Sequence, residues 1–130
     1  MLASDLSESL SKEYASYQLS MPQWRILATL GALHENSPHS ALTAKDIAVA
    51  TRLDKVQVSR ALERLVNKEI VHRRVSDSDK RATLVSLSSE GERIYRTLLP
   101  KIVRWQNKRL ENITDDEYQI FLKVIDALKP

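Results

Sequence analysis

Hydrophobic residues recur at intervals of three and four through most of the chain, which predicts a mainly helical protein. The spacing is clearest in 54–68, where a single apolar stripe runs along a helix whose other positions are polar or charged. The stripe consists of Val58, Ala61, Leu62, Leu65 and Val66. Asp54 precedes this helix and should cap it, because its carboxylate can accept hydrogen bonds from the free N–H groups of the first turn.

Five more helices are predicted, at about 2–19, 21–34, 43–51, 89–110 and 114–128. The first begins almost at the first residue, so whether it is complete stays open. Ser88 or Ser89 should cap the long helix, and Pro100 inside it should produce a kink. Three residue pairs have the spacing of a capping box, in which two side chains bond reciprocally to backbone N–H groups of the first turn. They are Ser20 with Gln23, Thr43 with Asp46, and Thr114 with Glu117.

The periodicity changes after the helix at 54–68. Runs of β-branched and apolar residues at 70–75 and 82–87 flank the charged segment SDSDKR, which predicts a hairpin. A lone hairpin is marginally stable, so it should pack on the helices through Val71, Val85 and Leu87. A short strand is expected at 41–42. The helix at 43–51, a three-residue turn containing Leu53 and the following helix predict a helix-turn-helix, and the added hairpin makes a winged helix.

The outer face of the helix at 54–68 carries side chains that can read bases. Gln can read adenine and Arg can read guanine in the major groove, while a flanking basic loop can contact phosphate or the minor groove. A charged outer face is also usual on any soluble helix, so this face alone does not establish DNA binding. The candidate DNA-binding residues are Lys55, Gln57, Ser59, Arg60, Arg64, Arg73, Arg74, Asp79, Lys80 and Arg81.

Composition limits the class of protein. The 130 residues suit one domain, and the absence of cysteine excludes disulfides and thiol chemistry. No apolar run approaches the roughly 18 residues of a membrane span, and no signal peptide is evident, so we expect a cytoplasmic protein. The net charge is +3, and the most basic segment, 93–109, holds six Lys/Arg and no acid. We expect that segment to be a solvated face paired with acidic residues at 111–117, with phosphate contact near Arg93 as the alternative.

No motif places a nucleophile beside a base, and two glycines are too few for a glycine-rich phosphate loop, so we expect neither an enzyme nor a cofactor. His34, Glu35 and His39 form a weak metal-binding pattern, for which ordinary surface histidines are the plainer interpretation.

Five sequence segments together resemble the MarR family of bacterial winged-helix transcription regulators. They are LSMPQWRILATL at 19–30, LTAKDIA at 42–48, VSRALERLVNKEIVHRR at 58–74, DSDKR at 77–81 and VSLSSEGE at 85–92. One departure is Lys68-Glu69, where the family usually has Gly between the recognition helix and the wing.

The resemblance implies a single domain over 1–130, with dimerisation helices at 1–20 and 89–130 around a DNA-binding lobe at 21–88. It implies that Gln57, Ser59 and Arg60 contact the major groove. Arg81 would enter the minor groove, oriented by a salt bridge to Asp77 or Asp79. The terminal helices also carry more apolar surface than one small lobe can bury, which independently favours a homodimer. The expected interface residues are Leu6, Leu10, Ile94, Leu98, Ile102, Trp105, Tyr118, Phe121, Leu122 and Ile125.

The expected function is therefore that of a repressor that binds a palindromic operator as a homodimer. The family implies release by a small-molecule effector, expected to be an aromatic anion. The candidate effector-binding residues are Tyr14, Tyr17, Trp24 and Arg25, although aromatics at helical spacing are more often core. Two alternatives stay open: a winged helix used as a protein-interaction module without sequence-specific DNA binding, and a metal-responsive regulator.

Overall fold

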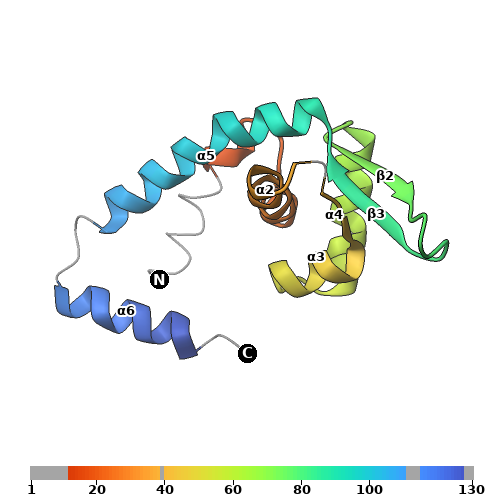
Figure 1. The fold of residues 1–130 in the computed structure, drawn as a ribbon. Helices are drawn as coiled ribbons and strands as arrows, with labels where there is room; N and C mark the ends of the chain where they lie inside the picture. Colours follow the sequence, from red (N-terminus) through yellow and green to blue (C-terminus); the bar gives the residue numbers. More distant parts are fainter. Residues whose placement is uncertain (1–11, 39, 111–114, 128–130) are drawn as a thin grey trace.

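The computed structural model describes residues 12–38, 40–110 and 115–127 (Figure 1). Its helices are α2 (Met21–Asn36), α3 (Ala44–Thr51), α4 (Lys55–Asn67), α5 (Ser89–Leu110) and α6 (Asp115–Ala127), and its strands are β1 (Leu42–Thr43), β2 (Val71–Val75) and β3 (Thr83–Leu87). Within the first predicted helix, 12–15 are helical and 16–18 form a turn, so that helix ends earlier than expected. The predicted cap Thr114 lies outside the described residues.

The three strands form an antiparallel sheet in the order β1-β3-β2. Val71 pairs with Leu87 at the base of the β2–β3 hairpin, and Val75 pairs with Thr83 toward its tip. The short strand before α3 was predicted one residue early, and it pairs with β3, which the local pattern did not indicate. Figure 1 shows the hairpin projecting beyond α4, so its tip lies away from the rest of the lobe.

Helix α2 forms the centre of the core, because its apolar residues lie on most of its sides. Ile26 and Leu27 are fully buried. Helices α3, α4 and α5 and the sheet all contact α2. Leu53 in the turn between α3 and α4 is 6% exposed, which confirms that it fills the space between these helices. The predicted hairpin packing is confirmed for Val71 and Val85, which are 2% and 1% exposed.

Helix α5 leaves the lobe as a long arm that continues through Pro100, and α6 lies beneath the far end of this arm (Figure 1). Ile94, Leu98 and Ile102 are buried within the chain itself. These three side chains therefore give no argument for a second subunit. Of the other expected interface residues, Trp105 is half-buried and Leu122 is 40% exposed. Leu6, Leu10 and the side chains of Tyr118, Phe121 and Ile125 lie outside what the structure describes.

The cations at the start of α5 pair with acids of the same helix. Arg93 contacts Glu90 through two hydrogen bonds, and Arg96 lies 3.3 Å from Glu92. The hydrogen bond from Arg93 lowers the pKa of Glu90, and the same contact raises the pKa of Arg93. For these two arginines the expected pairing with 111–117 is thus replaced by contacts one turn away. No helix in the described ranges is long and apolar enough to cross a membrane.

Candidate nucleic-acid interface

The first helix of the helix-turn-helix is fixed by its own ends. The side chain of Thr43 accepts a hydrogen bond from the Asp46 N–H (3.1 Å), and the Asp46 carboxylate accepts one from the Thr43 N–H (3.2 Å), which confirms this capping box. At the other end Arg52 has a left-handed backbone, with φ of 60°, and ends α3. Ile47, on the inner face of α3, is fully buried. Helix α3 is therefore fixed at both ends and anchored in the core, which positions the turn into α4.

The first turn of α4 is capped as predicted, but the cap uses a candidate base-reading residue. The Gln57 N–H donates to the Asp54 carboxylate (2.8 Å), while the Asp54 N–H donates to the Gln57 Oε1 (3.1 Å). An amide that reads adenine needs both its oxygen and its nitrogen. The capping bond occupies the oxygen, so in this conformation Gln57 retains only its amide N–H groups for a partner.

A Schellman motif ends α4, in the place where the sequence lacks the expected glycine. The Ile70 N–H donates to the Leu65 carbonyl and the Glu69 N–H donates to the Val66 carbonyl, both at 2.9 Å. Glu69 takes the left-handed position of this motif, with φ of 60°. Leu65 and Ile70 are both buried, which supplies the hydrophobic contact that usually accompanies the motif. Helix α4 is therefore connected to β2 by the usual turn geometry, although Glu69 stands where the family usually has glycine.

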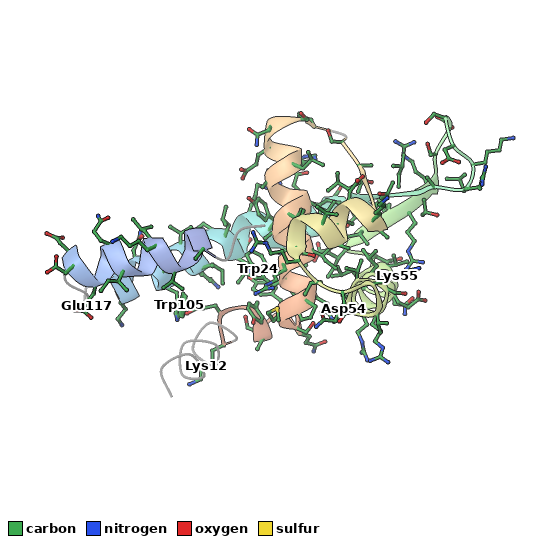
Figure 2. All side chains as sticks on the ribbon, turned by 90° about the horizontal axis from the view of Figure 1, so that it is seen from below. Lys12, Trp24, Asp54, Lys55, Trp105 and Glu117 are labelled. Carbon is green, nitrogen blue, oxygen red and sulfur yellow. The ribbon has the colours of Figure 1, made fainter. Side chains whose placement is uncertain are left out.

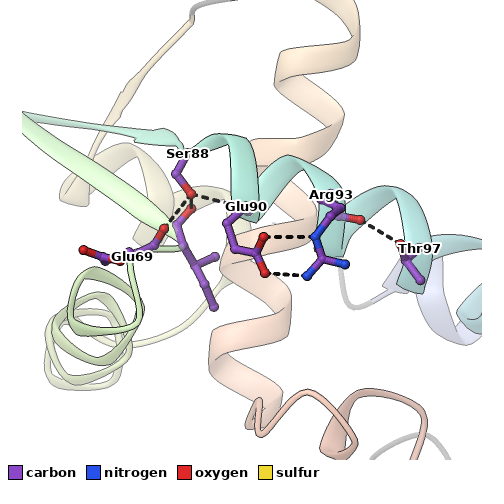
Figure 3. Close-up of polar contacts among 7 residues, drawn as sticks. Glu69, Ser88, Glu90, Arg93 and Thr97 are labelled. Atoms are coloured by element: carbon purple, nitrogen blue, oxygen red, sulfur yellow. Dashed lines mark hydrogen bonds and ion pairs between the residues drawn. The ribbon is translucent and has the colours of Figure 1, made fainter.

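Ser88 joins the recognition helix, the wing and α5 at one point (Figure 3). Its hydroxyl lies within hydrogen-bond distance of the carbonyls of Glu69 (2.6 Å) and Ile70 (2.8 Å), and it accepts a hydrogen bond from the Gly91 N–H (3.0 Å). Of the two serines considered for the cap, Ser88 is the one that caps α5. A Cβ at Gly91 would lie 2.1 Å from the Ile70 carbonyl oxygen, so only glycine fits this approach.

Lys68 connects the end of α4 to the N-terminal segment. Its ammonium donates to the Gln18 carbonyl and to the Gln23 Oε1, the latter at 3.2 Å. Ser20 accepts from the Gln23 N–H (3.3 Å), but the Gln23 side chain is directed to Lys68. The predicted capping box of α2 is therefore only half formed, because the Gln23 side-chain oxygen accepts from the Lys68 ammonium and not from the backbone of Ser20. Burial, followed by the charge of Arg64, lowers the pKa of Lys68.

All ten predicted DNA-binding side chains are exposed, and they lie on α4 or on the neighbouring hairpin. Arg73 forms a salt bridge of 3.1 Å with Glu63 of α4, so the hairpin and the helix are also linked across this surface. Figure 2 shows Lys55 on the lobe, far from Trp105 on the arm and Glu117 on α6. Sequence reasoning missed Val56, which is 57% exposed in the first turn of α4. Its place on the helix face opposite the buried stripe was the available signal.

The tip of the hairpin corrects one expectation. The Asp79 carboxylate accepts a hydrogen bond from the backbone N–H of Arg81 (3.0 Å). Within the described residues, no salt bridge joins the Arg81 guanidinium to Asp77 or Asp79. Asp79 shapes the turn, assisted by the Ser76 hydroxyl, which accepts from the Asp79 N–H (3.3 Å). The guanidinium of Arg81 is left exposed at the tip.

A family model for the MarR family matches residues 17–82, which cover α2 to the tip of the hairpin. The chain belongs to the MarR family.

Two curated relatives of this MarR-family chain are HTH-type transcriptional regulators. BilQ of Clostridium symbiosum is 24% identical over 84 residues, which are 65% of this chain and 58% of BilQ. YfiV of Bacillus subtilis, an uncharacterized regulator, is 28% identical over 116 residues, which are 89% of this chain and 69% of YfiV. The chain thus spans little more than half the length of BilQ.

Solved structures confirm the predicted winged-helix fold. Staphylococcus aureus MepR in a complex with DNA superposes with a TM-score of 0.84 at 18% identity, covering 98% of this chain and 90% of MepR. PcaV of Streptomyces coelicolor, in a complex with its natural ligand, gives a TM-score of 0.79 at 22% identity, covering 98% of this chain and 88% of PcaV. At these identities the similarity concerns the fold.

The four candidate effector residues of this MarR-family chain fall into two groups. Tyr14 and Trp24 are buried in the core, and Trp24 stacks on Tyr95 with ring centres 6.4 Å apart. Burial raises the pKa of the Tyr14 hydroxyl, an effect that the charge of Arg25 partly offsets. Tyr17 is half-buried with the Lys101 ammonium 5.8 Å from its ring centre, and Arg25 is exposed. Only this second pair is accessible without moving the core.

The weak metal pattern is not assembled in the described part of the chain. His34 lies 3.4 Å from Glu92 of α5. Burial, together with Glu35, raises the pKa of the Tyr95 hydroxyl. His39 lies outside the described residues, and within them no cluster of three potential ligands occurs. His34 instead contacts α5 through Glu92.

Proposed function

We propose that this protein is a transcriptional regulator that binds duplex DNA, with α4 in the major groove and the tip of the β2–β3 hairpin in the minor groove. The observation that carries the proposal is the placement of ten exposed polar and charged side chains on these two contacting elements. Arg60 would read guanine from α4, and Arg81 would occupy the minor groove. The MepR–DNA complex supports this assignment, because its fold matches over nearly the whole chain.

We propose further that the DNA-binding form is a homodimer on a palindromic site. Helices α5 and α6 expose Val103, Ile120, Leu122 and Val124, which are 40–61% accessible to solvent in the single chain. Figure 1 shows α6 apart from the winged-helix lobe, so Ile120, Leu122 and Val124 have no cover from that lobe. A second copy would bury them and place two recognition helices about one DNA turn apart, ~34 Å.

The regulator would act as a repressor that a small aromatic anion releases. An aromatic carboxylate would use an accessible ring and a cation, which the half-buried Tyr17 and the exposed Arg25 can each supply. Lys101, 5.8 Å from the Tyr17 ring centre, supplies a second cation. The PcaV complex supports ligand control, because it shows the same fold bound to a natural ligand.

The test begins with selection of bound duplexes from a random pool, followed by mobility-shift titration of the enriched sequence. Arg81→Ala should weaken binding by ~1–3 kcal/mol, and affinity should fall steeply with salt because phosphate contacts release counterions. Arg104→Ala removes an exposed arginine from the α5 arm and should leave affinity unchanged. Addition of aromatic carboxylic acids, or of Zn²⁺, should distinguish an organic effector from a metal.

Two results would contradict the proposal. If no sequence is enriched and binding is insensitive to salt, the winged helix serves as a protein-interaction module. If Arg81→Ala and Arg104→Ala weaken binding equally, the hairpin tip has no specific role.

A further inference from the structure

Val56 is an exposed apolar side chain within a polar surface. It is the second residue of α4 and is 57% exposed, between the exposed side chains of Lys55 and Gln57. Isolated exposed hydrophobic residues are common on soluble proteins, so exposure alone assigns no role. Valine is also a poorer helix former than alanine, because its branched side chain restricts χ1. Neither the core nor the helix therefore requires a valine here.

The position of Val56 on α4 directs it to the same side as the base-reading arginine. Residues four apart on a helix lie on one face, so Val56 and Arg60 are neighbours. The buried stripe of Val58, Leu62 and Leu65 lies on the opposite side of the helix. Four residues advance a helix by about 6 Å, which corresponds to one or two base-pair steps. Val56 and Arg60 can thus contact neighbouring bases in one groove.

The capping box makes Val56 more important for readout. Because the Gln57 Oε1 accepts from the Asp54 N–H, the glutamine cannot bind adenine through both amide atoms without opening the cap. The N-terminal residues of a recognition helix are those that contact base edges. In this first turn, Val56 is the side chain that presents an apolar surface with no polar partner to satisfy.

We propose that Val56 is a specificity-determining residue that contacts the C5-methyl group of a thymine, one or two base pairs from a guanine read by Arg60. Thymine is the only standard DNA base with a methyl group in the major groove, and small apolar side chains discriminate it by contact. The inference rests on the proposed function and deepens it, because it names the base that the apolar position selects.

The experiment replaces single thymines by uracil in the duplex selected by the wild-type protein. Uracil removes only the methyl group and keeps the Watson–Crick edge. At one thymine per half-site, wild-type affinity should fall about fourfold, as expected for loss of one buried methyl contact. Val56→Ala should bind the thymine and uracil duplexes equally at that position. Val49→Ala is the matched control, because Val49 is a 74% exposed valine on α3 and should leave the fourfold dependence intact.

Each outcome of the uracil experiment either supports or refutes the role of Val56. Circular dichroism first checks that the variants are folded, and Val56→Ser, which removes both γ-methyl groups, serves if Val56→Ala is not folded. If no thymine shows methyl dependence in the wild type, or if the dependence survives in the Val56 variant, the inference is wrong while sequence-specific binding still stands. If no duplex is enriched at all, the proposed function fails and the inference fails with it. Loss of the dependence in the Val56 variant alone supports the inference.

Discussion

Replacement of Glu69 by glycine should stabilise the protein. Glu69 occupies the left-handed position that ends α4, with φ of 60°. A residue with a Cβ pays about 1–2 kcal/mol for this conformation, whereas glycine adopts it freely. Glycine also gains entropy in the unfolded chain, which costs ~0.4–1 kcal/mol. The difference leaves an expected increase of about 0.5–1 kcal/mol in the free energy of unfolding.

The main-chain contacts at this turn should survive the replacement. The Glu69 N–H donates to the Val66 carbonyl, and its own carbonyl faces the Ser88 hydroxyl at 2.6 Å. Both groups belong to the backbone, so glycine keeps them. Urea unfolding followed by circular dichroism, at one fixed protein concentration, measures the change.

Glu69→Ala is the control, because it removes the carboxylate but keeps the Cβ. A negative charge near a helix C-terminus is mildly unfavourable, so alanine should gain a few tenths of a kcal/mol at most. Equal stabilisation by alanine and glycine would show that charge, and not backbone strain, governs this site. A glycine variant less stable than wild type would refute the reasoning altogether.

Two further changes test the contact between α5 and the start of the hairpin, and the electrostatics of the proposed DNA-binding surface. Gly91→Ala should destabilise the fold by about 1–3 kcal/mol, because its Cβ would lie 2.1 Å from the Ile70 carbonyl oxygen; unchanged urea stability would contradict this close approach. Glu63→Gln should tighten duplex binding and steepen the salt dependence by about one unit, since it removes an anion and frees Arg73 for phosphate. Mobility-shift titrations at several salt concentrations measure this effect, and a flat response would mean that Arg73 does not face DNA.

The sequence predicted the elements well because their signals are local. The capping box of Thr43 with Asp46 and the cap that Asp54 gives to α4 involve residues three apart, and both predictions are confirmed. The change from helical to alternating spacing correctly located the hairpin. All ten predicted DNA-binding residues are exposed, since a polar residue outside a buried stripe has no reason to be covered.

Predictions that depended on a choice between partners were less successful. Gln23 was expected to cap its own helix, yet its side chain bonds Lys68, 45 positions away. The Asp79 carboxylate was one of two expected to orient the Arg81 side chain, yet it accepts from the Arg81 backbone. For Gln23 the folded chain brought a distant donor to the side-chain oxygen, whereas Asp79 accepts from a backbone N–H only two residues away.

Burial was the other property that spacing could not resolve. Ile94, Leu98 and Ile102 form an apolar stripe that fits a dimer interface or the chain's own core equally well, and the structure places all three in the core. Val56 shows the reverse case, as an apolar residue that remains exposed.

The sequence by itself determined the type, order and capping of the helices and strands, because these follow from interactions within one or two turns. The tertiary structure alone decided which apolar faces are already covered, which acid holds Arg73 and which donor engages the Gln23 side chain. Those outcomes depend on competition among groups that only folding brings within bonding distance. The surface available to a partner consists of the groups that the folded chain neither buries nor pairs.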